Sequence, residues 1–467
     1  MRNKKIKIKK LLKYSLLVLP MATISCGNYY SVSKNENKEQ TNEWKEDIKN
    51  NVVVSNILEL QDEADVNFYF SGWGIQPFYN LIRLAMLSKK DVKYYYDNSK
   101  EFQLNLNVNE FSAFLNEKRK VDSPTENSIE AISGEENEYY QIADKFAKEN
   151  PNKKINVFFN SDHLFNYSKK NAVDTFEELT KNKNVTLIGI EDSDLLGDYF
   201  YNGFWNTDSF KDVWFDKENN EWLVPTPGYT NRQNQYLLFN KYDNVKFLWS
   251  NKNLVKKLIN LGFKNVYSFL NEENKELKDV IFTTRDNATE KAKRLSVYWP
   301  KIIGLDWRKE KEIVDQAKAK NNKPSLIILG TNSYKNDVYS IDIILEKYKD
   351  KYNLFYKGHP GINYISSEIS KKYSDENNLV HVLESQIQSE ELTTNHATEE
   401  DGLFFEKWVG LDSISSALRG IKNGKNTIDD LLAVYDVGKG KFIVKDESET
   451  EFNESIELLT QYLNENK

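Results

Sequence analysis

The sequence predicts an α/β protein whose parallel sheets are covered by helices on both faces. Two observations carry this prediction. Short apolar and β-branched runs recur after the first 65 residues, and longer segments with a helical spacing of apolar residues lie between them. Such an alternation over several hundred residues is typical of parallel sheets. With 467 residues and 39% hydrophobic content, the chain is long enough for two large domains or three ordinary ones.

The predicted elements run from residue 66 to the end of the chain. Strands are expected at 66–70, 155–160, 185–190, 245–249, 280–283, 325–330 and 353–356, and helices at 78–88, 139–149, 172–181 and 339–349. A charged helical stretch ends before Lys323-Pro324, so we place the boundary between two domains, 52–322 and 323–447, at this point. The segment 448–467 has the apolar spacing of an amphipathic helix. By analogy with two-domain α/β enzymes, we expect this helix to pack back on the first domain.

The N-terminus has the layout of a signal peptide. Seven basic residues precede a largely apolar stretch at 14–24. The segment 22–27, ATISCG, resembles the lipobox of bacterial lipoproteins, which predicts a signal peptide at 1–25, a lipidated Cys26 and a polar tether at 26–51. The rest of the protein would then lie outside the cell, held on its membrane by lipid chains. The alternative is an uncleaved signal anchor with an incidental cysteine.

Composition excludes several function classes. The formal charge of −7 gives no general attraction to nucleic acids, so no nucleic-acid partner is expected. Cys26 is the only cysteine, which excludes disulfide-stapled scaffolds, cysteine-based zinc sites and a cysteine nucleophile further along. HExxH, P-loop and GxGxxG patterns are absent. The sequence leaves the oligomeric state open.

Polar residues directly after the apolar runs are the candidates for chemistry, because open α/β sheets bind ligands beyond the carboxyl ends of their strands. Four such segments stand out, namely NSDH at 160–163, EDSD at 191–194, GTNSY at 330–334 and KGHP at 357–360. His359 lies between a glycine and a proline and could present a ring nitrogen to a ligand oxygen. The alternative is a histidine that only shapes its loop.

Two further segments are open to more than one interpretation. The acids at 191–194 suit a general base, but acids at a strand end also cap helices, and Asp192-Ser193-Asp194 mimics a metal-binding DxD. The segment 412–418 combines hydroxyl groups with the start of a helical pattern, which suits either a phosphate site or an ordinary helix cap. Glu390 alone would be taken for solvated surface, and His381 and His396 have no special spacing.

Taken in order, these segments resemble the bacterial sialyltransferases that use CMP-sialic acid and carry a D/E-D/E-G motif and a K-G-H-P motif. The likeness spans roughly 66–421 and is strongest in SLIILGTNSY, followed by a helix and NLFYKGHPG. The resemblance implies a GT-B fold, in which two Rossmann-like domains enclose a cleft. The first domain would bind the acceptor and the second the nucleotide sugar.

The resemblance also implies roles for residues of the second domain. His359 would contact the donor phosphate and assist the departure of CMP, with Lys357, Gly358 and Pro360 beside it near the cytosine. Gly330 and Thr331 belong to the family's GT-rich loop. Glu390 would hold the ribose hydroxyls, and Ser415 and Ser416 would bind the phosphate, although one residue is inserted before this pair relative to the family pattern.

In the first domain, Asn160 and His163 match an N-x-x-H segment that faces the substrates. Glu191 matches the general base and Asp192 its neighbour, but Ser193 replaces the glycine of the base motif. The predicted function is therefore a membrane-anchored, metal-independent inverting sialyltransferase that needs no cofactor and uses CMP-sialic acid as donor and a galactose-type glycan as acceptor. The alternatives are a surface lipoprotein that binds a glycan or solute without catalysis, and a transferase for another nucleotide sugar.

Overall fold

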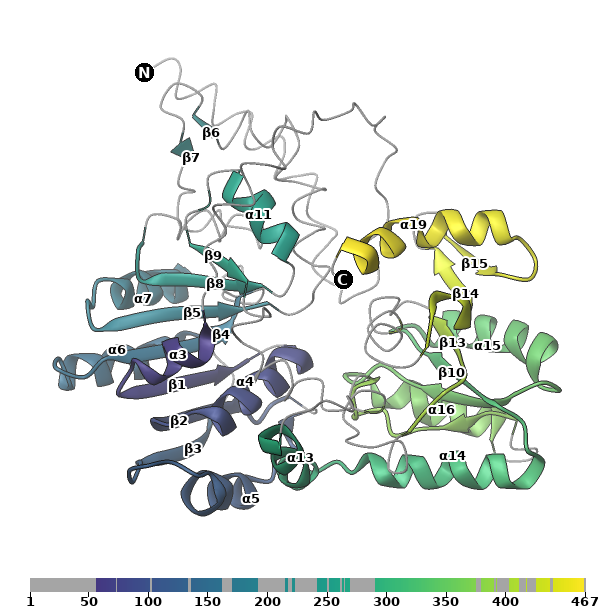
Figure 1. Ribbon diagram of the computed structural model, residues 1–467, viewed down its shortest axis with the longest axis horizontal. Helices are drawn as coiled ribbons and strands as arrows, with labels where there is room; N and C mark the ends of the chain where they lie inside the picture. Colours follow the sequence, from purple (N-terminus) through teal and green to yellow (C-terminus); the bar gives the residue numbers. More distant parts are fainter. Residues whose placement is uncertain are drawn as a thin grey trace.

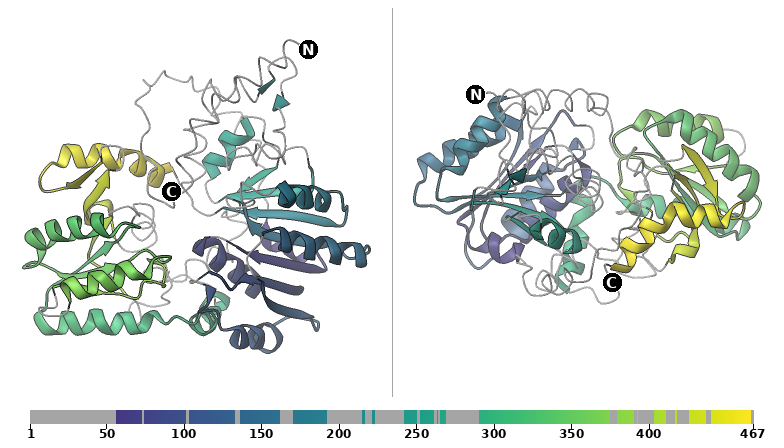
Figure 2. Two further views of the ribbon diagram at one scale, coloured as in Figure 1. Left: turned by 180° about the vertical axis from the view of Figure 1, so that it is seen from behind. Right: turned by 90° about the horizontal axis from the view of Figure 1, so that it is seen from above.

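A computed structural model describes residues 56–72, 74–100, 103–132, 136–161, 170–191, 215–216, 221–222, 242–249, 252–260, 263, 265–268, 290–374, 379–389, 392, 403–410, 417, 426–436 and 440–465. The signal peptide, Cys26 and the tether lie outside these residues, as does the strand predicted at 280–283. Figures 1 and 2 show two sheets in separate lobes that stand side by side, with α13 (Glu290–Ile303) and α14 (Trp307–Asn321) leading from one to the other.

The N-terminal sheet is parallel and has the strand order β3-β2-β1-β4-β5-β8-β9. Its strands are β1 (Val66–Ser71), β2 (Asp91–Asp97), β3 (Asn127–Ile132), β4 (Ile155–Asn160), β5 (Val185–Ile190), β8 (Val245–Trp249) and β9 (Val266–Ser268). A separate short pair is formed by β6 (Phe215–Asp216) and β7 (Glu221–Trp222). The chain moves outward from β1 to β3 and then returns to the other side of β1. This reversal is the topological switch point of a Rossmann-like sheet.

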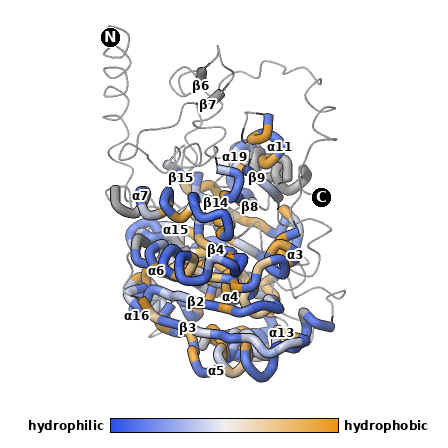
Figure 3. Tube along the Cα trace, turned by 90° about the vertical axis from the view of Figure 1, so that its left-hand side faces the viewer, coloured by the Kyte–Doolittle hydropathy of each residue, from blue (hydrophilic) through white to orange (hydrophobic). Residues whose placement is uncertain are grey.

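Helices cover both faces of this sheet because its central strands bury side chains on both sides. Phe68 of β1 belongs to one core with α6 (Glu136–Glu149), α7 (Lys170–Thr180) and α11 (Lys252–Asn260). Tyr69 belongs to the opposite core with α13, and the other elements of that face are α3 (Ile57–Asp62), α4 (Ile75–Leu87), α5 (Val108–Ala113) and η2 (Phe114–Lys118). Figure 3 shows α6 mostly in the hydrophilic colour, as expected for a helix that buries one stripe.

The C-terminal sheet has the order β12-β11-β10-β13-β14-β15, parallel except for the last strand. Its strands are β10 (Ser325–Leu329), β11 (Asn353–Lys357), β12 (His381–Val382), β13 (Lys407–Gly410), β14 (Leu431–Asp436) and β15 (Lys441–Val444). α15 (Tyr334–Tyr348) and α16 (Asn363–Tyr373) cover one face, and the short helix η6 (Ile428–Asp430) leads into β14. The order again reverses beside the first strand, between β10 and β13. The predicted class, two Rossmann-like domains in one α/β chain, is therefore confirmed.

The helix α14 belongs to the second domain by its packing, which differs from the boundary predicted at residue 322. Trp307, Val314 and Ala317 lie in the core that β10 and β11 form, together with Phe452 and Ile456 of α19 (Glu449–Glu465). The change of core thus comes before Trp307. The charged surface of α14 resembles a linker helix, whereas its narrow apolar stripe faces the second sheet. A contact between α19 and the first domain stays a prediction, since side chains from 458 onward lie outside the described residues.

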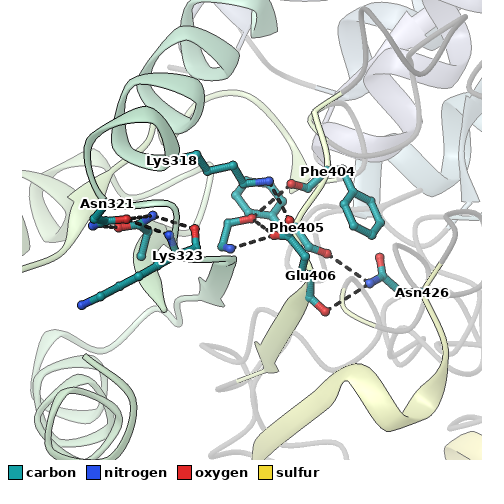
Figure 4. Close-up of polar contacts among 9 residues, drawn as sticks. Lys318, Asn321, Lys323, Phe404, Phe405, Glu406 and Asn426 are labelled. Atoms are coloured by element: carbon teal, nitrogen blue, oxygen red, sulfur yellow. Dashed lines mark hydrogen bonds and ion pairs between the residues drawn. The ribbon is translucent and has the colours of Figure 1, made fainter. Parts of the chain in front are cut away.

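Glu406 fastens α14 to the start of this sheet (Figure 4). Its carboxylate accepts hydrogen bonds from Lys318 Nζ at 2.8 Å, from the Ser325 amide at 2.7 Å, and from the Ser325 hydroxyl. Burial alone would raise the pKa of Glu406, but these bonds outweigh it and hold the pKa below its usual value. The ionised form is therefore stabilised by folding.

We predict that Glu406→Gln reduces the acid sensitivity of the fold. A depressed pKa contributes stability above the unfolded-state pKa and loses it as pH falls through the folded-state pKa. The wild-type free energy of unfolding should therefore drop more steeply than that of the variant between about pH 6 and pH 3. Urea titrations at each pH measure this. Glu447→Gln, which removes an exposed partner of Lys347, is the control and should resemble the wild type; parallel curves for Glu406→Gln and wild type would contradict the prediction.

Candidate active site

Two glycine-containing loops meet at the carboxyl edge of the C-terminal sheet. β10 and β11 are parallel neighbours with Leu329 opposite Lys357, so the loops that begin at Gly330 and Gly358 leave the sheet together. The Gly330 amide donates a hydrogen bond of 2.9 Å to the Lys357 carbonyl. Leu329 also pairs with Gly410 at the end of β13, which places the Gly330 loop at the switch point, where open α/β sheets bind ligands.

The first loop is held by a buried acid that sequence reasoning missed. Both carboxylate oxygens of Asp337 lie within hydrogen-bond distance of the Thr331 amide, at 3.0 and 3.1 Å, and Oδ2 accepts a bond of 2.5 Å from the Tyr356 hydroxyl. Burial raises the pKa of Asp337, and the bonds from Tyr356 and Thr331 oppose that shift. The only sequence signal was an acid in the first turn of a helix, which is common at helix N-termini.

Gly330 is required for this packing. A β-carbon at this position would lie 2.3 Å from the Tyr356 hydroxyl oxygen and 2.6 Å from the ring carbon that bears it. The tyrosine cannot retreat easily, since its hydroxyl is bonded to Asp337. The glycine therefore lets the loop lie against the adjacent strand.

His359 is neutral and has a defined tautomer. The Gly361 amide donates to its Nδ1 at 3.2 Å, so the ring proton of the neutral form is on Nε2. Burial, together with the nearby charge of Lys357, lowers the pKa of His359 to about 4. At neutral pH the half-buried ring is thus a hydrogen-bond donor through Nε2.

Lys357 connects the His359 loop to the segment before Glu390. Only 2% of Lys357 is exposed, and its ammonium group donates to the Gly358 carbonyl at 2.6 Å and the Ser385 carbonyl at 2.7 Å. The Ser385 hydroxyl also bonds with Asn363 at the start of α16. The KGHP segment and the turn around Ser385 are therefore adjacent. The bonds described here give Lys357 a role in joining loops, whereas its expected place near the cytosine stays a prediction.

Of the remaining predicted residues of this domain, the structure describes Gly358 and Pro360. Gly358 packs closely on α16, since a β-carbon there would lie 2.1 Å from the Ser366 hydroxyl. Pro360 is half-buried and follows His359 into the turn before α16. Glu390, Ser415 and Ser416 lie outside the described residues.

In the N-terminal domain, Asn160 and Glu191 lie at the ends of neighbouring strands. Asn160 pairs with Ile190, and the Ser161 hydroxyl donates to the Ile190 carbonyl at 3.1 Å. Gly189 makes room for this contact, because a β-carbon there would lie 2.8 Å from Ser161 Cβ. Glu191 is only 3% exposed, and its amide donates to the Leu248 carbonyl at 3.3 Å. Asp192 and His163 lie outside the described residues.

A glutamine that sequence reasoning did not single out fixes the end of β1, at the switch point of this sheet. Gln103 Nε2 donates to the carbonyls of Ser71 and Gly72 at 3.2 and 2.6 Å, while its Oε1 accepts from the Ser71 hydroxyl and the Asp97 amide at 3.1 and 2.9 Å. No sequence signal marks Gln103, because its partners lie at the ends of β1 and β2 and belong to no pattern around residue 103. A β-carbon on Gly72 would meet no atom within 4 Å.

Each half of the candidate site is therefore assembled within its own domain. Whether Glu191 and His359 act on one ligand stays a prediction. Among the described residues, no group of three or more histidine, cysteine and acidic side chains is placed to hold a metal ion.

We predict that Gly330→Ala destabilises the protein by about 1–3 kcal/mol, because the new methyl group overlaps the ring of Tyr356. Gly72→Ala is the matched control, since the added methyl group enters open space at the corresponding strand end of the other domain. Chemical denaturation of both variants measures the difference. Equal stability of the two variants would show that the Gly330 loop is not packed as described.

We further predict that the His359 ring titrates with a pKa of about 4. Its ring C–H signals in an NMR titration should stay at their neutral positions through the range where an ordinary histidine, with a pKa of about 6.5, takes up its proton. The variant His359→Asn assigns the signals by their loss. Titration near the ordinary value would contradict the burial and charge arrangement described for this loop.

Comparisons with known proteins give only structural likenesses at low sequence identity. The sequence matches no family model, and no curated protein matches it. Among solved structures, a UDP-N-acetylglucosamine 2-epimerase is similar with 13% identity, a TM-score of 0.39, and coverage of 86% of this chain and 90% of that one. A UDP-GlcNAc 2-epimerase from Neisseria meningitidis has 14% identity, a TM-score of 0.40, and coverage of 86% and 94%. The wall teichoic acid polymerase TagF has 13% identity, a TM-score of 0.38, and coverage of 100% and 91%. The strand orders and the two separate pairs of cores assign this chain the GT-B-like arrangement of two Rossmann-like domains.

Proposed function

We propose that the protein is an inverting glycosyltransferase, and that it moves sialic acid from CMP-sialic acid to a galactose-type acceptor. The observation that carries this proposal is the pair of loops at the carboxyl edge of the C-terminal sheet, the first of them at the switch point. There a neutral histidine with its proton on Nε2 lies beside the glycine loop that Asp337 holds. The order of the sequence segments, GTNSY, KGHP and the stretch before Glu390, supports the choice of family.

In this proposal the C-terminal domain stabilises CMP as it leaves. Negative charge builds up on the phosphate of CMP as its bond to the sugar breaks. In this proposal His359 Nε2 donates a hydrogen bond to a phosphate oxygen, with further bonds from Ser415 and Ser416. A donor with a pKa of about 4 stabilises the departing phosphate by hydrogen bonding rather than by protonating it at neutral pH. The buried charge of Lys357 adds a favourable field near the same loop.

The other half of the reaction takes place in the N-terminal domain. Glu191, or Asp192 beside it, takes the proton from an acceptor hydroxyl. The acceptor oxygen then attacks the anomeric carbon from the side opposite to CMP, and the bond between that carbon and the phosphate oxygen breaks through an oxocarbenium-like transition state. Asn160 and His163 would contact the substrates at this edge.

The location of the protein is part of the proposal. A lipid-modified Cys26 would hold the chain on the outer face of the cell membrane, with 26–51 as a tether. Among the described helices, none is long and apolar enough to cross a membrane.

The proposal predicts that CMP binds the full-length chain and that His359→Ala weakens this binding. Removal of one donor that acts on the developing charge should also reduce the transfer rate about 10² to 10³-fold. Isothermal titration with CMP, and product analysis with CMP-sialic acid and lactose, measure the two effects. His381→Gln is the matched histidine control on the neighbouring strand β12 and should behave as the wild type.

The substitution Glu191→Gln separates binding from chemistry. CMP affinity should stay close to that of the wild type. Transfer should be lost where Glu191 is the base, because the hydroxyl proton then has no acceptor, whereas retained transfer would assign the proton to Asp192. Transfer only from UDP-sugars would reassign the donor. Failure to bind CMP and to transfer any sugar would leave a binding lipoprotein as the better interpretation.

A further inference from the structure

We infer that Asn105 and Gln386 form a positioning pair that fixes the strand-end loops of the two domains relative to each other. Asn105 Nδ2 donates a hydrogen bond to Gln386 Oε1, and the two residues are 281 positions apart in the sequence. As far as it concerns catalysis, this inference rests on the proposed function.

The Asn105 side of the contact is tied to the end of β1. Gln103, two residues earlier, bonds to Ser71 and Gly72, as described above, and its carbonyl accepts from the Leu106 amide at 3.1 Å. The Asn107 amide donates to the Ile302 carbonyl of α13 at 2.8 Å. The loop that carries Asn105 is therefore braced both against the strand end and against the last helix of its domain.

Asn105 also lies against the point where the chain leaves the first domain. Gly304, between α13 and α14, has a φ of +70°, which favours glycine. A β-carbon at Gly304 would lie 2.0 Å from the Asn105 carbonyl oxygen. The connection between the domains thus packs directly on the residue that makes the contact.

The Gln386 side of the contact is tied to the His359 loop. The preceding residue, Ser385, accepts a bond from the Lys357 ammonium group through its carbonyl. The Glu384 amide donates to Glu310 Oε2 of α14 at 3.0 Å, and the Gln386 amide donates to Glu384 Oε1 at 3.1 Å. This turn can move little without disturbing Lys357 or α14.

The pair therefore connects Gly72, at the switch point of the first sheet, to Gly358, at the end of β11 in the second sheet. The connection runs through hydrogen bonds that short stretches of backbone join. A series of contacts does not by itself prove energetic coupling, which has to be measured. In a two-domain transferase, the attacking oxygen and the leaving group are held by different domains, and a small misplacement costs rate. The pair should therefore affect kcat and leave the KM for the donor nearly unchanged, because the bonds of Lys357, Ser385 and Asn363 stay intact without it.

Two sets of substitutions test the inference. In the first set each single variant should lose activity, whereas in the second set only the double variant should. Asn105→Ala and Gln386→Ala should each lower kcat about tenfold, with the donor KM within about twofold of wild type, and the double variant should be no worse than either single one. Asn105→Asp and Gln386→Glu should each keep the contact, because an amide can donate to a carboxylate, whereas their combination places two carboxylates together and should lower kcat as the alanine variants do. Additive effects in both sets would overturn the inference. Leu104→Ala, at an exposed neighbour, is the control.

A cross-linking experiment tests the contact without any substrate. In the chain with Cys26→Ser, which leaves no other cysteine in this sequence, the pair Asn105→Cys and Gln386→Cys should be joined by a short bis-thiol-reactive reagent that spans about the length of the two original side chains. The matched pair Leu104→Cys and Gln386→Cys should be joined at least tenfold more slowly. Equal rates would overturn the contact itself. If the cross-link forms but the wild type neither binds CMP nor transfers sugar, then the proposed function fails while the positioning pair stands.

Discussion

The buried ammonium group of Lys357 is the interaction on which the C-terminal half of the site depends. A charge removed from water is tolerated only where hydrogen bonds replace its hydration, and the carbonyls of Gly358 and Ser385 supply two of these bonds. Because the two carbonyls belong to different loops, satisfying the charge also joins the loops. The same charge helps to keep His359 neutral, so that the ring presents a donor proton at physiological pH. Lys357 thus joins the two loops and adds to the effect of burial on the protonation state of His359.

The neighbouring loop is shaped by steric limits as much as by polar contacts. Tyr356 occupies the space that a side chain at residue 330 would need, and its hydroxyl orients Asp337 toward the Thr331 amide. In the other domain Gln103 holds the end of β1 through hydrogen bonds between neutral groups alone. The two strand ends are therefore fixed by different chemistry. Burial raises the pKa of Asp337, whereas the amide of Gln103 has no proton equilibrium that burial could shift.

Much of the fold followed from local sequence, because strands buried on both faces are continuous apolar runs. β1, β4, β5, β10 and β11 were all predicted within about one or two residues of their observed ends. β2 and β3 were missed because charged or exposed residues interrupt them, and β12, β13 and β15 have only two to four residues, too few for a pattern. β14 was also missed, although its first four residues form a buried apolar run. The positions of Gly330, His359 and Glu191 were predictable as strand-end residues. Asp337 and Gln103 were not, since their roles are defined by partners that only the folded chain brings near.

The way in which Glu406 joins α14 to β10 has a consequence for biosynthesis. The apolar stripe of α14, with Trp307, Val314 and Ala317, is made before any strand of the sheet that covers it. Its partner carboxylate follows Lys318 only 88 residues later. A growing chain therefore carries an uncovered amphipathic helix while the second domain is still being translated. During that interval its apolar residues have no sheet to pack against, so α14 cannot reach the docking described here before residue 406 is made.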